Sequence, residues 1–149
     1  MTPEKLYAER EIYRTLVAFA YAMDHREWEA LETFVRADVT TDFGMGSVLY
    51  GREAMIKAMR SFLDDCGPTQ HLLGNVVIDV EGDVATSRAY VSDMHKGVGD
   101  KSEVTFSTLG EYHDRWRRID GTWYMIHRTK LNRATLGDIS VLGPGFTNN

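Results

Sequence analysis

The feature that most constrains the fold is a change of pattern at Pro68. Before it, apolar residues recur at three- and four-residue spacing, as they do on one face of a helix. After it come long stretches rich in β-branched and aromatic residues, separated by short turns that contain glycine. Helices followed by strands, rather than alternating with them, predict an α+β fold. The length of 149 residues fits a single domain spanning residues 1–149.

Three helices are expected before Pro68. The first runs from Pro3 to Met23 and carries a continuous apolar stripe, which consists of Ile12, Leu16, Phe19, Ala20 and Met23. Shorter helices are expected over about 27–35 and 52–65. Gly51 precedes the third helix and Gly67 follows it, and glycine at such places indicates a helix boundary.

Four long strands are expected after Pro68, over residues 69–80, 84–95, 103–118 and 122–131. Short turn signals at 81–83 and 120–121 predict that neighbouring strands pair in an antiparallel meander. A further strand is predicted over 39–43. Strands of this length must bend, so we expect a cone-shaped, curved antiparallel sheet packed by the N-terminal helices around an apolar pocket.

Charge and hydropathy exclude several classes of partner. The formal net charge is -5, and the basic residues within 115–118 alternate between the two faces of a strand, so we predict no nucleic-acid partner. No apolar run approaches the roughly 20 residues of a membrane-spanning helix, and we predict no membrane partner. The first ten residues are polar and do not predict a signal peptide, so a cytoplasmic location is expected.

No familiar catalytic or metal motif is present. The chain has no Gly-x-Ser-x-Gly or His-Glu-x-x-His segment, and Cys66 has no second thiol with which to build a zinc cluster. The histidines, at 25, 71, 95, 113 and 127, show no tight ligand spacing. We therefore predict neither a metal nor a cofactor.

Asp24 and His71 are the polar residues best placed for chemistry. Asp24 falls at the edge of the apolar stripe of the first helix, and His71 begins the first long strand. An imidazole oriented by a carboxylate is an effective base near neutral pH. The alternatives are ordinary: Asp24 and Glu27 are spaced like a capping box that opens the second helix, and His71 fits a hydrogen-bonded core histidine.

Several short motifs occur in an order that resembles the SnoaL-like branch of the nuclear-transport-factor-two-like superfamily. They are Tyr21-Ala-Met-Asp24, Trp28-Glu-Ala-Leu31 with Phe34 and Asp38, Gly51-Arg-Glu-Ala54, Thr69-Gln-His71-Leu-Leu-Gly-Asn75, Gly82-Asp83-Val-Ala85, Tyr112-His-Asp-Arg115, and Asp120-Gly-Thr-Trp123 with Arg128. The resemblance covers nearly the whole chain. Within this branch the chain looks most like the group of scytalone dehydratase, hexachlorocyclohexane dehydrochlorinase and the bile-acid dehydratases.

The resemblance implies an activity and a set of site residues. In that group an Asp at the position of Asp24 and a His at that of His71 form a catalytic dyad that needs no metal or cofactor. The dehydrochlorinase also has an arginine at the position of Arg128. We therefore expect a cofactor-independent lyase, dehydratase-like, that acts on a hydrophobic, cyclic small molecule. The alternatives are an isomerase or polyketide cyclase of the same fold, and a non-catalytic ligand-binding or association domain.

The chain departs from this group near the expected dyad. Phe19 stands where the dehydrochlorinase has lysine and the bile-acid dehydratases tyrosine, and Met23 stands where scytalone dehydratase has tyrosine. His95 has the strand parity of a pocket-facing residue and is a further candidate acid. The substrate-binding residues that we predict are Phe19, Met23, Phe43, Phe62, Val91, His95 and Tyr112.

Two regions leave alternatives open. Strand parity groups Arg128 with Tyr124 and Ile126, opposite Trp123 and Met125, and an ion pair with a sheet carboxylate such as Glu111 competes with a role at the pocket. The tail, residues 136–149, carries apolar residues among glycines, and it either closes the pocket mouth or forms a subunit contact. We also expect a homo-oligomer, a dimer or trimer, because a curved sheet leaves an apolar outer face.

Overall fold

The computed structural model describes residues 1–143. The elements are α1 (Pro3–His25), η1 (Trp28–Thr33), β1 (Val35–Asp42), β2 (Leu49–Tyr50), α2 (Arg52–Leu63), β3 (Thr69–Glu81), β4 (Val84–Lys96), η2 (Gly99–Lys101), β5 (Thr105–Ile119), β6 (Thr122–Gly137) and η3 (Ile139–Val141). The strands form one sheet in the order β2-β1-β6-β5-β4-β3. The expected α+β architecture is confirmed, but the helices do not all precede the strands, since β1 and β2 come before α2.

Local sequence signals set the ends of α1. The Thr2 hydroxyl caps the first turn by accepting from the Lys5 amide, and Pro3 occupies a position where its missing N–H costs nothing. The helix continues two residues beyond the predicted end at Met23. It stops at Arg26, whose backbone is left-handed with a φ of 58°. The second predicted helix is only the short 3₁₀ helix η1, and α2 ends two residues before its predicted end at Asp65.

The sheet is mixed. Strands β3 to β6 form the predicted antiparallel meander, with turns at Gly82 and Gly121. The strand predicted over 39–43 is the longer β1, and it pairs with β6 in parallel. The expectation of a wholly antiparallel sheet was therefore wrong at this pair. Partners so far apart in the sequence share no turn whose residues would indicate their direction.

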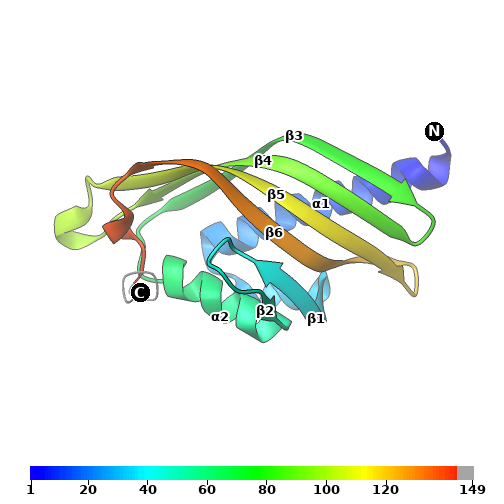
Figure 1. The fold of residues 1–149 in the computed structure, drawn as a ribbon, viewed down its shortest axis with the longest axis horizontal. Helices are drawn as coiled ribbons and strands as arrows, with labels where there is room; N and C mark the ends of the chain where they lie inside the picture. The colour runs from blue at the N-terminus through cyan, green and yellow to red at the C-terminus, as the bar shows by residue number, and fades with distance from the viewer. Residues whose placement is uncertain (144–149) are drawn as a thin grey trace.

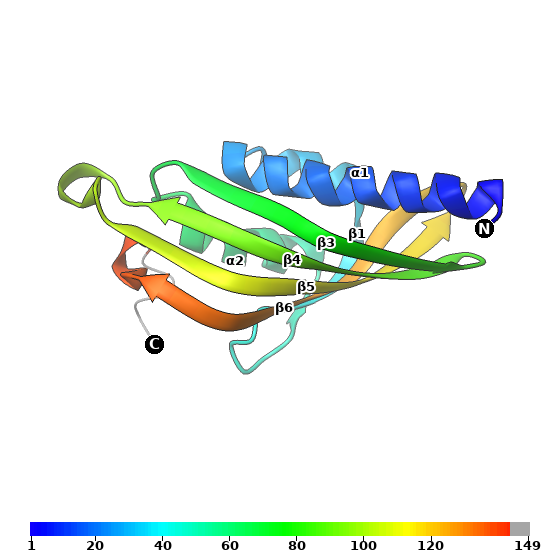
Figure 2. The same ribbon diagram turned by 90° about the horizontal axis from the view of Figure 1, so that it is seen from above.

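The long strands curve, and the helices close the structure on one side. Figure 2 shows α1 lying along the sheet, and Figure 1 shows α2 with β1 and β2 on the same side of the four long strands. The core between them includes Ile12, Leu16, Phe19, Trp116 and Trp123, each almost fully buried. Among the described residues, no helix has the length and apolarity needed to span a membrane.

The other face of the sheet carries exposed apolar side chains. They are Leu72, Tyr90, Met94, Leu109, Leu131 and Leu136. The strand register places several of them in rows across the sheet, with Leu72 and Leu109 on either side of Ser92 and Tyr90 and Leu131 on either side of Glu111. The predicted self-association into a dimer or trimer would bury an exposed apolar surface such as this face of the sheet.

Candidate active site

Asp24 and His71 lie in direct contact. The His71 Nδ1 atom is 2.6 Å from the Asp24 Oδ1 atom, and the His71 amide donates to Asp24 Oδ2 at 2.9 Å. Only 4% of the His71 side chain and 15% of the Asp24 side chain is exposed. The capping hypothesis for Asp24 was wrong, since Glu27 is the N-cap of η1 and no side chain caps that helix.

The Asp24 carboxylate is held in one orientation by its neighbours. The Thr69 hydroxyl donates to Asp24 Oδ1 at 3.0 Å and in turn accepts from the Arg26 guanidinium at 2.8 Å. The same guanidinium donates to the carbonyls of Met23, Leu63 and Gly67, and so ties the ends of α1 and α2 to the start of β3. Arg26 thereby joins the helix that carries Asp24 to the strand that carries His71.

These contacts lower the pKa of the Asp24 carboxyl group. Burial acts to raise the pKa of Asp24, but the hydrogen bonds from His71 and Thr69 and the His71 charge outweigh it, so the pKa lies below its ordinary value. An ionised carboxylate only accepts hydrogen bonds, so we assign the proton between the two side chains to His71 Nδ1. With Nδ1 directed at Asp24, Nε2 is the ring nitrogen left to accept a proton from a substrate, as a general base does.

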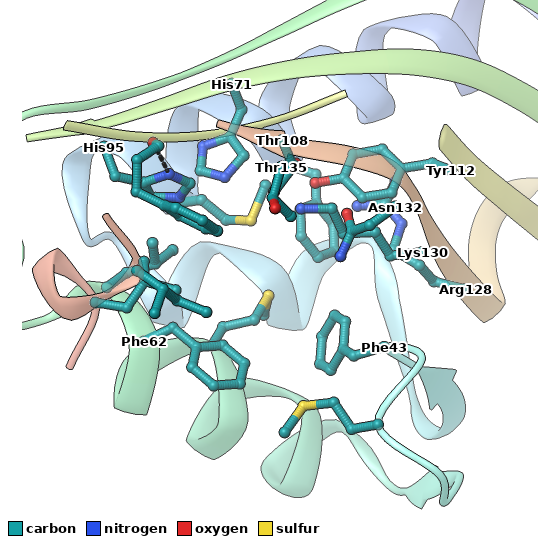
Figure 3. Close-up of a pocket in the computed structure, with 18 residues that line it drawn as sticks. Phe43, Phe62, His71, His95, Thr108, Tyr112, Arg128, Lys130, Asn132 and Thr135 are labelled. Carbon is teal, nitrogen blue, oxygen red and sulfur yellow. Dashed lines mark hydrogen bonds between the residues drawn. The ribbon is translucent and has the colours of Figure 1, made fainter. Parts of the chain in front are cut away.

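His71 borders a cavity enclosed between the sheet, the end of α1, and α2. Its volume is about 140 Å³. Figure 3 shows that Phe43 and Phe62 lie on one side of this space while His71, His95, Thr108 and Tyr112 project from the sheet. The cavity therefore has an apolar wall on the helix side and a polar wall on the sheet side.

Most of the predicted substrate-binding residues line this cavity. They are Phe19, Met23, Phe43, Phe62, His95 and Tyr112. Val91 is the exception: it is buried in the core and is not among the lining residues. Ile139 and Leu142 also line the cavity, so this part of the tail does border the pocket. Phe146, in the rest of the tail, lies outside the described residues.

Two β-bulges in β6 set the side chains that this strand contributes to the polar wall. Trp116 pairs with Met125 and Arg115 with His127, which leaves Ile126 as the extra residue; Arg133 is extra in the same way further along the strand. Between the bulges, the side chains of Arg128, Lys130 and Asn132 line the cavity. The predicted parity was therefore wrong, because the bulge at Ile126 turns Arg128 to the same face as Trp123 and Met125.

Arg128 is buried at the cavity wall and is largely occupied by protein contacts. Its Nε and Nη2 atoms donate to the two carboxylate oxygens of Asp114 at 2.8 and 2.9 Å, so its partner is Asp114 rather than Glu111. The guanidinium carbon lies 4.3 Å from the ring centroid of Phe19 and 3.7 Å from that of Tyr112. Arg128 thus fixes two cavity-lining rings through cation–π contacts.

A second polar cluster on the sheet wall surrounds Asp93. Its side chain is fully buried and accepts hydrogen bonds from the Thr108 amide and hydroxyl, at 2.7 and 2.6 Å, and from Lys130 Nζ at 2.8 Å. Burial acts to raise the pKa of Asp93, but the charge and hydrogen bond of Lys130 outweigh it and hold the pKa below its ordinary value. Asp93 is therefore ionised and paired with the Lys130 ammonium.

His95 adds a second imidazole to this wall. Its ring meets the His71 ring edge to face, with centroids 5.5 Å apart, and its Nδ1 lies 2.9 Å from the Phe106 carbonyl oxygen. A carbonyl only accepts, so Nδ1 carries the proton. Burial lowers the pKa of His95, and the charge of Asp93 offsets this only in part, so His95 is neutral at neutral pH.

Within residues 1–143, His71, Asp93 and His95 form a cluster that could hold a metal ion, since each offers a ligand atom within 4.8 Å of the others. Sequence spacing did not reveal the cluster, because it forms only when β3 pairs with β4 and sets His71 opposite Asp93. Both Asp93 oxygens already accept hydrogen bonds, and Lys130 supplies the positive charge that a cation would bring. The donor arrangement fits the lysine ammonium better than a metal ion.

The buried Asp93 carboxylate predicts sensitivity to acid. Because folding lowers its pKa, its stabilising effect is complete above the ordinary value of 3.8 and is lost as the pH falls through the lower pKa of the folded protein. We expect the wild-type free energy of unfolding to decrease below about pH 4 more steeply than that of Asp93→Asn. Urea titrations across acidic pH measure this, with the exposed Asp100→Asn as control; parallel curves for wild type and Asp93→Asn would contradict it.

Fold and site together define a class of protein: a curved sheet closed by N-terminal helices, with a carboxylate–imidazole pair at the wall of an internal cavity. The model of the SnoaL-like domain matches residues 4–129. The chain therefore belongs to the SnoaL-like family.

Known relatives and structures agree with this assignment. The uncharacterised protein Rv2910c of Mycobacterium tuberculosis is 31% identical over 121 residues, covering 80% of this chain and 82% of its own. A candidate scytalone dehydratase from Novosphingobium aromaticivorans superposes with a TM-score of 0.81 at 23% identity, covering 97% of both chains. The LinA-type3 hexachlorocyclohexane dehydrochlorinase of Novosphingobium barchaimii gives a TM-score of 0.79 at 14% identity, covering 90% of this chain and 92% of its own. These similarities establish the fold.

Proposed function

We propose that the protein is a cofactor-independent lyase that catalyses a dehydratase-like elimination on a hydrophobic, cyclic small molecule. The observation that carries the proposal is the 2.6 Å contact between His71 Nδ1 and Asp24, with the His71 ring at the wall of the cavity. His71 Nε2 is the general base that removes a proton from carbon. Asp24 holds the ring and stabilises the imidazolium that forms.

The cavity supports this proposal through its two different walls. The apolar wall, with Phe43, Phe62 and Met59, suits a hydrophobic ring, and it keeps water from the reacting atoms. The sheet wall presents donors that interact with charge developing during the reaction. The activities named for the neighbours, dehydratase and dehydrochlorinase, are both eliminations, which favours the same reaction class here.

Arg128 contributes to this proposed site mainly by positioning. Since Asp114 occupies two of its donor groups and the Phe19 and Tyr112 rings lie close to its guanidinium, it fixes the shape of the cavity next to the base. Phe19, at a position where the dehydrochlorinase and bile-acid dehydratases have a polar residue, instead packs its ring against the Arg128 guanidinium.

An isomerase of the same fold is the second candidate, and His95 favours it. The Nε2 atom of His95 is unprotonated, and the centroids of the His95 and His71 rings are 5.5 Å apart. Two bases therefore lie next to each other at one cavity. One imidazole can take a proton from one carbon, and the imidazolium that forms can return that proton to another carbon, directly or through the second imidazole. Mass spectrometry separates the two, because elimination loses a small molecule from the substrate and isomerisation leaves its mass unchanged.

The ring opening of a nitrobenzisoxazole tests the proposed base with a defined probe. In this elimination the base removes the ring C–H proton, the electron pair forms a nitrile, and the N–O bond breaks to release a coloured phenolate. We expect wild-type protein to accelerate it. We expect Asp24→Asn to lose about 10- to 100-fold of that acceleration, the equivalent of one charge-assisted hydrogen bond.

The control is Asp65→Asn, which removes an exposed carboxylate from the loop before β3. It should leave the rate unchanged. Equal rates for wild type and Asp24→Asn, with both variants folded by circular dichroism, would refute the dyad. Absence of any acceleration by wild type would refute the proposed base itself.

A further inference from the structure

We propose that Lys130, held in place by Asp93, is the oxyanion-binding residue of this cavity. The assignment rests on the proposed function, in which His71 removes a proton from the substrate. In an elimination the C–H electron pair forms the new π bond, and the electron pair of the broken bond departs with the leaving group, which therefore gains negative charge. Where a carbonyl group is conjugated to the carbon that loses the proton, negative charge also develops on its oxygen. A cation on the same wall as the base stabilises that charge.

The position of Lys130 supports this role. It lines the cavity on β6, and 16% of its side chain is exposed. Asp93 accepts a hydrogen bond from Lys130 Nζ at 2.8 Å. A carboxylate oxygen of Asp93 also lies within 4.8 Å of a His71 ring nitrogen. The ammonium and the base therefore both lie near one buried carboxylate, and Figure 3 shows His71 and Lys130 on the sheet side of the cavity.

The donors of Lys130 are only partly used. An ammonium has three N–H groups. Among residues 1–143, Lys130 Nζ donates one side-chain hydrogen bond, to Asp93. Arg128, the other cation of this wall, already donates to both oxygens of Asp114. Lys130 is therefore the better donor to a bound oxygen.

The neighbouring backbone leaves room for the Lys130 stem. A Cβ atom placed on Gly110, on the adjacent strand β5, would lie 3.2 Å from Lys130 Cε and 2.9 Å from a methyl group of Val91. Gly110 faces Asn132 at the edge of the second β6 bulge. The missing side chain at this position allows the lysine to run along the sheet to Asp93.

In the nitrobenzisoxazole reaction each group has one task. The ring proton goes to His71 Nε2, the C–H electron pair forms the nitrile, and the N–O electron pair stays on the departing phenolate oxygen. Lys130 donates a hydrogen bond to that oxygen and need not lose its proton. The cavity should consequently prefer ligands that carry negative charge on oxygen next to an apolar ring.

Binding of para-nitrophenol tests this preference without requiring turnover. The free phenol and phenolate differ in absorbance, so the ionised fraction of bound ligand is read directly at a pH where most free ligand is neutral. We expect wild type to bind the phenolate in preference to the phenol. Lys130→Met should reduce that preference by about 10- to 100-fold.

Matched variants separate this assignment from the proposed function. The exposed Lys57→Met should keep the wild-type preference. His71→Asn should keep it as well while losing elimination activity, because the base and the oxyanion donor are different residues. If Lys130→Met leaves Asp93 unpaired and unstable, the double variant Asp93→Asn/Lys130→Met removes both charges and should show the same loss. An unchanged phenolate preference in the folded double variant, or a loss in His71→Asn instead, would overturn the assignment.

Discussion

Replacing His71 with alanine is expected to reduce the acceleration of nitrobenzisoxazole ring opening by about 10²- to 10⁴-fold, the usual contribution of a general base. The reason is positional. The His71 ring lines the cavity, and its Nδ1 is fixed by Asp24 at 2.6 Å. Without the ring, no other group of the proposed dyad reaches the substrate. Initial rates from phenolate absorbance, at saturating and limiting probe, measure the effect.

The fold should survive this change. His71 lines the cavity, so its replacement enlarges a space that already exists, and Asp24 keeps its hydrogen bonds from the backbone amide of residue 71 and the Thr69 hydroxyl. The matched control is His113→Ala, which removes an exposed imidazole and should retain the wild-type rate. A folded His71→Ala protein that retains activity would rule out His71 as the base.

Chemical rescue distinguishes a base from a structural role. Imidazole added to His71→Ala can occupy the space of the missing ring and accept the proton directly, so the rate should rise with imidazole concentration. The same addition to Asp24→Asn, which keeps its own ring, should have little effect. A rise of equal size in both variants would mean that imidazole acts from solution rather than inside the cavity.

The meeting of Asp24 and His71 was within reach of sequence reasoning because both residues sit at the ends of strongly patterned elements. The apolar stripe of α1 fixes the side on which Asp24 lies, and the turn chemistry after Gly67 fixes where β3 begins. The capping alternative followed from the spacing to Glu27 alone. It failed because a carboxylate facing the sheet binds groups of β3 that no local motif contains.

The contribution of β6 to the polar wall could not be predicted, because strand parity assumes a regular strand. Two bulges in β6, at Ile126 and Arg133, shift the alternation on either side of Arg128, Lys130 and Asn132. The residues of β6 do not by themselves predict a bulge, since bulges depend on how the strand twists against its neighbours. On the regular strand β4, parity placed His95 at the cavity, and the same rule would also have found Asp93.

The largest expected effect on stability comes from the buried pair of Arg128 and Asp114. Their side chains are 2% and 1% exposed and are joined by two parallel hydrogen bonds. Arg128→Met leaves the Asp114 carboxylate buried without its partner, which should cost roughly 3–5 kcal/mol in the free energy of unfolding. Urea unfolding followed by tryptophan fluorescence measures it, since Trp116 and Trp123 lie in the core.

A double variant shows whether this cost reflects the unpaired charge or the lost packing of the guanidinium. Arg128→Met/Asp114→Leu removes both charges, so if the buried carboxylate is the cause, most of the lost stability should return. If instead the contacts of Arg128 with the Phe19 and Tyr112 rings dominate, the double variant should remain as unstable as Arg128→Met, because methionine supplies no cation to either ring. The first result is expected, since a desolvated charge costs several kcal/mol and a cation–π contact contributes about 0.5–2 kcal/mol. Arg128 would then be retained at the cavity because Asp114 requires it there.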